Sequence, residues 1–285
     1  MTQTLRSHAL GARPALVWRT LLLVALAKLL LVAGCAQTTS SGLPAANPNR
    51  SVEPVTESDE PESRKRARIR LELAAGYFEQ GQTTVALDEI KLALAADPTY
   101  ASAYMLRGLV YSRMNEMGLA EESFRRAQQL NPRDPDVLHH YGLFACQQGR
   151  YAQAIEMFQQ ALLSPVYGGQ AKTLMAKGVC EVRAGQLAEA EGSLARAYEL
   201  DAGNPITAYN LASLQHRRGE NDKARFVIRR VNNSELANAE TLWLGIRVER
   251  RLGNTEAMQQ LAQQLGRRYP DSREWSAYQR GAFDE

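Results

Sequence analysis

The side chains of this sequence that could do chemistry are three cysteines, Cys35, Cys146 and Cys180, and four histidines. Thiols and imidazoles bind zinc at defined spacings, or act as nucleophile and base when they are paired. No H-E-x-x-H, P-loop or G-x-S-x-G motif occurs. The adjacent side chains of His139 and His140 would point about 100° apart on a helix, so we expect a surface pair. The sequence therefore predicts a protein that is not an enzyme, with no catalytic residue, metal, cofactor or small-molecule substrate.

Cys35 stands where an apolar segment ends and a polar one begins. The residues before it contain four basic side chains and no acidic one, and they end in the apolar run "TLLLVALAKLLLVAG". A basic lead followed by an apolar core is typical of a secretory signal peptide. The apolar run is shorter than the ~20 residues of a membrane-spanning helix, and Lys28 interrupts it. We therefore predict a signal peptide over residues 1–34.

The four residues Val32-Ala33-Gly34-Cys35 resemble the lipobox of bacterial lipoproteins. The resemblance implies that Cys35 becomes the lipidated N-terminus of the mature chain, with several acyl chains to hold it to a membrane. Ala36 stands where an inner-membrane retention signal would have aspartate, which implies sorting to the outer membrane, facing the periplasm. The alternative is an ordinary buried cysteine after a hydrophobic stretch.

Residues 35–66 join this anchor to the rest of the chain. The segment has four prolines, many polar residues and almost no large apolar side chain. It cannot bury enough surface to offset its ordering entropy, so we predict a disordered tether. The run "SRKRARIR" at 63–70 is interpreted as a solvated start of a helix, the alternative being a contact with anionic lipid or peptidoglycan.

The net charge argues against nucleic acid as a partner. The chain has 34 Lys+Arg and 31 Asp+Glu, and removal of the four basic residues of the signal leaves 30 against 31, a net charge of −1. Nucleic-acid binding usually shows a clustered basic surface. A nearly neutral mature chain gives no such indication.

The remaining sequence repeats with a period of 34 residues. Small residues recur at Ala74, Gly108 and Gly142, each within a pattern of aromatic and small residues that resembles the tetratricopeptide repeat (TPR). The resemblance implies an all-α fold, a TPR superhelix of about six helix-turn-helix repeats. We place the repeats within residues 67–270, at 67–100, 101–134, 135–170, 171–204, 205–237 and 238–270.

Residues 271–285 are expected to form a C-terminal capping helix, because the last repeat of such an array needs a cover. Asp271 and Glu274 have the spacing of a capping box at its start. Trp275 and Tyr278 would lie on one face and cover the last repeat. Gly281 would end the helix.

Cys146 and Cys180 both fall within helical patterns. We interpret them as small, buried or half-buried apolar residues. The alternative is a disulfide between neighbouring repeats, which an oxidising compartment would permit.

TPR resemblance also implies a concave groove lined by the first helix of each repeat. Apolar residues edged by arginines at this face suit an amphipathic, acidic partner segment. Methionine suits an adaptable binding surface. The predicted partner-binding residues are Phe78, Met105, Leu109, Arg113, Leu143, Met175, Arg183, Tyr209 and Arg217.

The signal, lipobox, tether, repeats and the ending "YPDS...YQRG.F" together resemble the PilF/PilW family of type IV pilus biogenesis lipoproteins. This resemblance implies a pilotin, which binds the secretin subunit in the periplasm, carries it to the outer membrane and promotes its multimerisation. The alternative is a TPR scaffold lipoprotein of cell-envelope assembly, an adaptor for peptidoglycan enzymes or for outer-membrane protein insertion.

Overall fold

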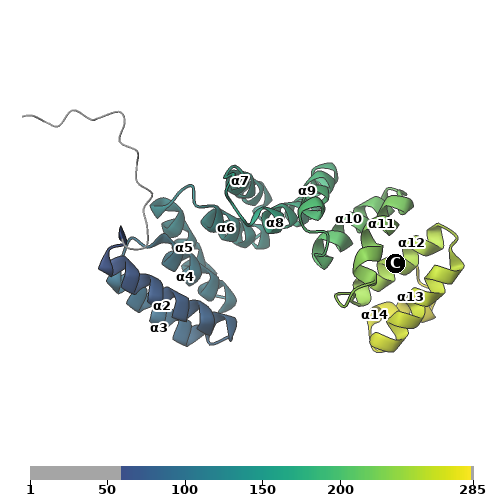
Figure 1. The fold of residues 1–285 in the computed structure, drawn as a ribbon, viewed down its shortest axis with the longest axis horizontal. Helices are drawn as coiled ribbons and strands as arrows, with labels where there is room; N and C mark the ends of the chain where they lie inside the picture. The colour runs from purple at the N-terminus through teal and green to yellow at the C-terminus, as the bar shows by residue number, and fades with distance from the viewer. Residues whose placement is uncertain (1–58, 284–285) are drawn as a thin grey trace, which may run out of the picture. The chain divides into compact units, whose positions relative to one another are not determined.

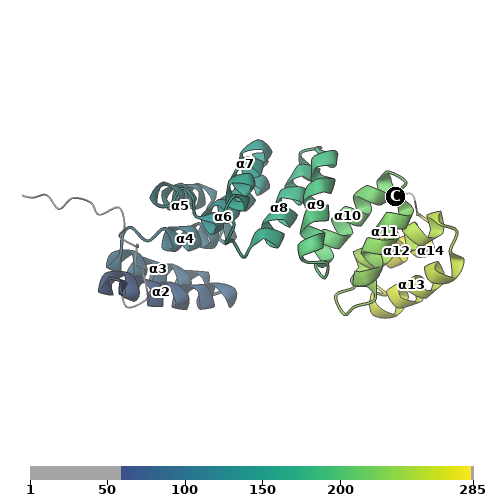
Figure 2. The ribbon, with the colours of Figure 1, turned by 45° about the horizontal axis from the view of Figure 1, so that its top comes forward.

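The structure of the protein is a computed structural model that describes residues 59–283. The described residues form thirteen helices and no strand, and the helices pair into consecutive hairpins (Figures 1 and 2). The first helices are α2 (Glu62–Glu79), α4 (Ala101–Arg113), α6 (Pro135–Gln147), α8 (Gln170–Arg183), α10 (Pro205–Arg217) and α12 (Ala239–Arg251). The second helices are α3 (Thr83–Ala96), α5 (Met117–Leu130), α7 (Tyr151–Leu162), α9 (Leu187–Leu200), α11 (Asn221–Asn232) and α13 (Thr255–Arg268).

A short helix, α14 (Arg273–Gln279), follows the sixth hairpin. The predicted all-α repeat fold is therefore confirmed. The signal peptide, Cys35 and most of the predicted tether lie outside the described residues.

The first described helix, α2, begins at Glu62, inside the segment 35–66 that we predicted to be disordered. Its first turn is held by Arg64, whose Nε donates to Asp97 Oδ2 at 2.5 Å and whose guanidinium lies 4.4 Å from the centre of the Tyr100 ring. Long-range contacts of this kind give the segment an ordered partner that composition alone does not reveal. The tether prediction was therefore wrong for residues 62–66, whereas the interpretation of 63–70 as the start of a helix is confirmed.

In three hairpins, α4–α5, α6–α7 and α8–α9, a glycine on the first helix faces a large residue on the second. A Cβ atom placed on Gly108 would lie 2.9 Å from the Phe124 ring, and one on Gly142 would lie 2.8 Å from the Phe158 ring. Phe124 and Phe158 are fully buried. The absence of a side chain at the glycine therefore sets the distance between the two helices.

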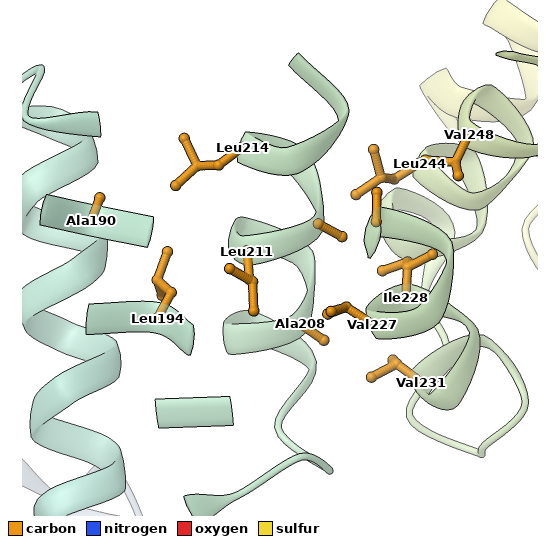
Figure 3. Close-up of a cluster of buried hydrophobic side chains, with 12 residues drawn as sticks. Ala190, Leu194, Ala208, Leu211, Leu214, Val227, Ile228, Val231, Leu244 and Val248 are labelled. Carbon is orange, nitrogen blue, oxygen red and sulfur yellow. The ribbon is translucent and has the colours of Figure 1, made fainter. Parts of the chain in front are cut away.

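Packing between hairpins continues the core along the chain. The cluster in Figure 3 joins α9, α10, α11 and α12 through side chains such as Leu194, Leu211, Ile228 and Leu244. A hairpin that lacked a neighbour would expose one side of such a cluster. The repeats consequently stabilise one another by stacking.

Cys146 of α6 and Cys180 of α8 form a disulfide, with their Cα atoms 6.0 Å apart. We had interpreted the two cysteines as buried and unpaired. They are buried, as expected, but the interpretation as unpaired residues was wrong, because they form a disulfide. The sequence could not decide the pairing, since helical periodicity does not show that two first helices place their cysteines face to face. The bond links the third and fourth hairpins directly.

The C-terminal helix α14 covers the last hairpin, but its N-cap differs from the prediction. Ser272, rather than Asp271, caps the helix, and its Oγ accepts a hydrogen bond from Trp275 N at 3.1 Å. Trp275 and Tyr278 stack with ring centres 5.4 Å apart, on one face as predicted. Gly281 follows the helix with a φ of +67°, a conformation that glycine adopts without strain.

Among residues 59–283, no helix combines the length and the apolar character that crossing a bilayer requires.

The close approach at Gly142 is testable by Gly142→Ala. The added methyl group collides with Phe158, so we expect the free energy of unfolding to fall by about 1–3 kcal/mol. The matched control is Gly192→Ala on α9, where a Cβ meets nothing within 4 Å and we expect a gain of about 0.5–1 kcal/mol from helix propensity. Urea unfolding measures both, and equal effects of the two substitutions would contradict the packing argument.

The disulfide closes a loop with a sequence separation of 34 residues. The double substitution Cys146→Ala/Cys180→Ala should lower the free energy of unfolding by about 2–4 kcal/mol, because the unfolded chain regains loop entropy. Unfolding with and without dithiothreitol checks this, since the reductant should destabilise the wild type and leave the double variant unchanged. A wild type that is insensitive to reduction would show that the bond contributes nothing.

Candidate functional site

The first helices form a common face. Each contacts the next first helix along the chain, from α2 to α4 and onward to α12. All nine residues predicted to bind a partner lie on these helices. They are Phe78 on α2, Met105, Leu109 and Arg113 on α4, Leu143 on α6, Met175 and Arg183 on α8, and Tyr209 and Arg217 on α10.

A groove opens on this face where α8, α10 and the start of α12 meet. Its volume is about 380 Å³, and two of the predicted residues, Arg183 and Tyr209, line it. The remaining lining combines apolar side chains with polar ones: Val179, Val182, Pro205, Ile206, Asn210, Asn238 and Glu240. We call these nine residues the α8–α10–α12 groove.

Tyr209 provides the groove with a polar group on an apolar body. Burial is the main cause that raises the pKa of its hydroxyl; Glu240 acts in the same direction, and Arg217 and Arg247 oppose it. The hydroxyl therefore stays protonated at neutral pH and can both donate and accept a hydrogen bond. Arg217 is exposed and close enough to influence Tyr209, which places it at the edge of the groove.

The described residues match several models of the tetratricopeptide repeat, over residues 101–134, 144–205, 181–240 and 242–272. The type IV pilus assembly protein PilF of Pseudomonas aeruginosa is 27% identical over 209 residues, which cover 73% of this chain and 83% of PilF. The solved structure of P. aeruginosa PilF has a TM-score of 0.72 at 26% identity, with 78% of this chain and all of that chain covered. The structure of PilW, a type IV pilus biogenesis factor, has a TM-score of 0.67 at 28% identity, with 74% and 97% covered.

The chain is a TPR protein related to the PilF/PilW type IV pilus assembly proteins. An uncharacterised protein of Haemophilus influenzae is also similar, at 30% identity over 47% of this chain and 75% of its own length. The matches make the TPR groove the natural place to look for a binding surface.

Seven of the nine groove residues are not among the predicted binding residues, because the prediction rested on fixed positions of each repeat. Ile206 is 53% exposed at the start of α10, and Asn210 and Glu240 lie beside it in the lining. A signal for the start of α10 was present, because Pro205 at the first helical position predicts that Ile206 falls in the first turn.

The N-terminal part of the predicted surface is arranged differently. The Arg113 guanidinium lies 3.8 Å from the centre of the Phe78 ring and donates to the Phe78 carbonyl oxygen at 2.5 Å. Met105 and Leu109 are half-buried and pack on the hydrophobic core between hairpins. Arg113 and Phe78 therefore hold α2 and α4 together. We had predicted that Arg113 offers its charge to a partner in the groove, but its guanidinium is already engaged by Phe78.

Of the other predicted residues, Leu143 and Met175 are half-buried, and Leu143 packs against the cluster around the disulfide. Neither lines the α8–α10–α12 groove. At the C-terminal end the first-helix face is covered, because the Phe283 ring stacks on Trp243 and lies 4.1 Å from the Arg250 guanidinium. Within residues 59–283, the groove described on this face lies between α8 and the start of α12.

The histidine pair is not on the surface as predicted. His139 is 4% exposed, and its Nδ1 lies 2.8 Å from Thr173 Oγ1, which in turn lies 3.1 Å from the Tyr167 hydroxyl. Burial lowers the pKa of His139 to about 3, so the ring is neutral at physiological pH. Within residues 59–283 no group of three or more His, Cys, Asp or Glu side chains could hold a metal ion. His139 is a structural residue between α6 and α8.

Substitution of Arg113 and Arg217 distinguishes an arginine that stabilises the fold from one that is only exposed at the surface. Arg113→Glu removes the ring and carbonyl contacts with Phe78 and should lower stability by about 0.5–2 kcal/mol. Arg217→Glu on the exposed groove edge should change it by less than about 0.5 kcal/mol. Thermal melts of the two variants check this, and a larger loss for Arg217→Glu would reverse the assignment.

Proposed function

We propose that the protein is a lipid-anchored pilotin of type IV pilus biogenesis. Lipidated at Cys35, it faces the periplasm from the outer membrane, binds the secretin subunit, and promotes the targeting and multimerisation of that subunit. The observation that carries the proposal is the similarity to PilF and PilW, which extends over about three quarters of the chain at 26–28% identity. The lipobox pattern at Cys35 supports the anchor.

The α8–α10–α12 groove is the proposed contact surface for the secretin. Val179, Val182 and Ile206 present apolar surface, and Arg183 and Arg217 supply positive charge at the edge. Tyr209 adds a hydroxyl that can pair with a peptide backbone. This combination fits a segment of the partner that carries apolar residues beside a carboxylate.

The decisive experiment deletes the gene and follows the secretin by membrane fractionation and by its heat-resistant multimers. We expect the secretin to leave the outer-membrane fraction and its multimers to decline. Wild type should restore both, whereas Cys35→Ser, which removes the lipid attachment site, should not restore targeting. Palmitate labelling of the same strains reports directly on the anchor.

The groove is tested in the same strain by Arg183→Glu/Ile206→Ser, two changes at exposed positions. We expect reduced secretin multimers at normal protein level, with Arg125→Glu on α5 as an exposed control that restores them fully. Persistence of secretin multimers and pili in the deletion strain would refute the pilotin function. Crosslinking to peptidoglycan enzymes or to the barrel-insertion machinery would then favour the scaffold alternative.

A further inference from the structure

Helix α11 carries an unusual outer surface. Its inner residues, Val227, Ile228 and Val231, are buried against α10 and α12 (Figure 3). Phe226 stands on the other side and is 77% exposed. Every other aromatic side chain within residues 59–283 is at least partly buried. An aromatic ring left in water at this position is not explained by the packing of the array.

A pocket of about 570 Å³ lies beside Phe226, between α9 and α11. It is lined by Tyr198 of α9 and by residues of α11 and its C-terminal end: Asp222, Arg225, Phe226, Arg229, Arg230 and Asn233. We call these seven residues the α9–α11 pocket. Three arginines against one aspartate give the lining a net charge of +2.

The charges of this pocket are only partly neutralised within the protein. Arg225 pairs with Asp222 at 2.9 Å. Arg229 and Arg230 are exposed and make no salt bridge with a carboxylate of residues 59–283. Some other arginines on the surface of the array, such as Arg68, Arg150 and Arg218, do have such partners. The two arginines are therefore available to an outside acid.

Tyr198 completes the pocket with a hydroxyl group. Burial is the main cause that raises its pKa, and Arg230 acts in the opposite direction. The group is protonated at neutral pH and can donate to a carboxylate or a carbonyl oxygen.

We propose that the α9–α11 pocket is a second protein-binding site, which takes an acidic partner segment carrying an aromatic side chain. The aromatic side chain would pack on Phe226, while flanking carboxylates pair with the Arg229 and Arg230 guanidinium groups, whose planar geometry suits bidentate contact. The site lies on second helices and is distinct from the groove, which lies on first helices. It does not depend on the proposed function.

Two observations favour a peptide over an anionic membrane surface. A single exposed apolar residue gives little area for insertion among lipids. A pocket, rather than a flat basic face, suits an inserted side chain.

The test measures binding of a fluorescein-labelled peptide EDEFEDE to the purified full-length chain by fluorescence anisotropy. We expect saturable binding that Arg229→Glu/Arg230→Glu weakens about tenfold or more, because both charge pairs become repulsive. Phe226→Ser should also weaken it. The uncharged peptide QNQFQNQ should bind much less, and so should EDEGEDE.

The matched control is Arg66→Glu/Arg125→Glu, which reverses two exposed arginines elsewhere on the array and should leave the affinity unchanged. The groove variant Arg183→Glu/Ile206→Ser should also bind normally. No binding to wild type, or loss with the groove variant alone, would overturn the proposal. The proposal would also be overturned if the protein bound phosphatidylglycerol vesicles but not the peptide, and if that binding depended on Arg229 and Arg230.

Discussion

The array depends on one steric constraint, the close approach of the two helices within each hairpin. In three hairpins a glycine of the first helix faces a large side chain of the second: Gly108 with Phe124, Gly142 with Phe158, and Gly178 with Leu194. The large residue enters the space that a side chain at the glycine would take, and it becomes fully buried there. Because the same pairing recurs, these three hairpins present similar surfaces to their neighbours. Stacking, and hence the common face of first helices, follows from it.

The connection between α7 and α8 shows how a departure from the repeat is accommodated. The chain from Leu163 to Gly169 contains two residues beyond the regular period, and Tyr167 from this connection is buried beside Thr173 and His139. A short chain of polar contacts and the Cys146–Cys180 bond join α6 to α8 here. The junction thus replaces some of the regular packing by specific polar and covalent contacts.

The sequence predicted the fold well because period and residue size are local properties. The small residues at 74, 108 and 142 predict three helical hairpins, and in the structure they lie on the first helices α2, α4 and α6. Features that depend on three-dimensional neighbours were predicted poorly. Arg113 has the right repeat position for a groove, yet Phe78 of the preceding repeat engages it. His139 was predicted to lie on the surface, yet it is buried beside Thr173 and Tyr167, which are distant from it in the sequence.

The same reasoning explains why the candidate surfaces were predicted unevenly. Position in the repeat selected Arg183 and Tyr209, and the structure places both in the lining of the α8–α10–α12 groove. Position in the repeat makes no prediction for the second helices, because their outer side has no consensus for function. Phe226 could have been noticed there, because an aromatic residue next to arginines on the polar side of an amphipathic helix contradicts the pattern of α11. In a repeat protein, a residue that breaks the pattern of its own helix is therefore as informative about function as one that follows it.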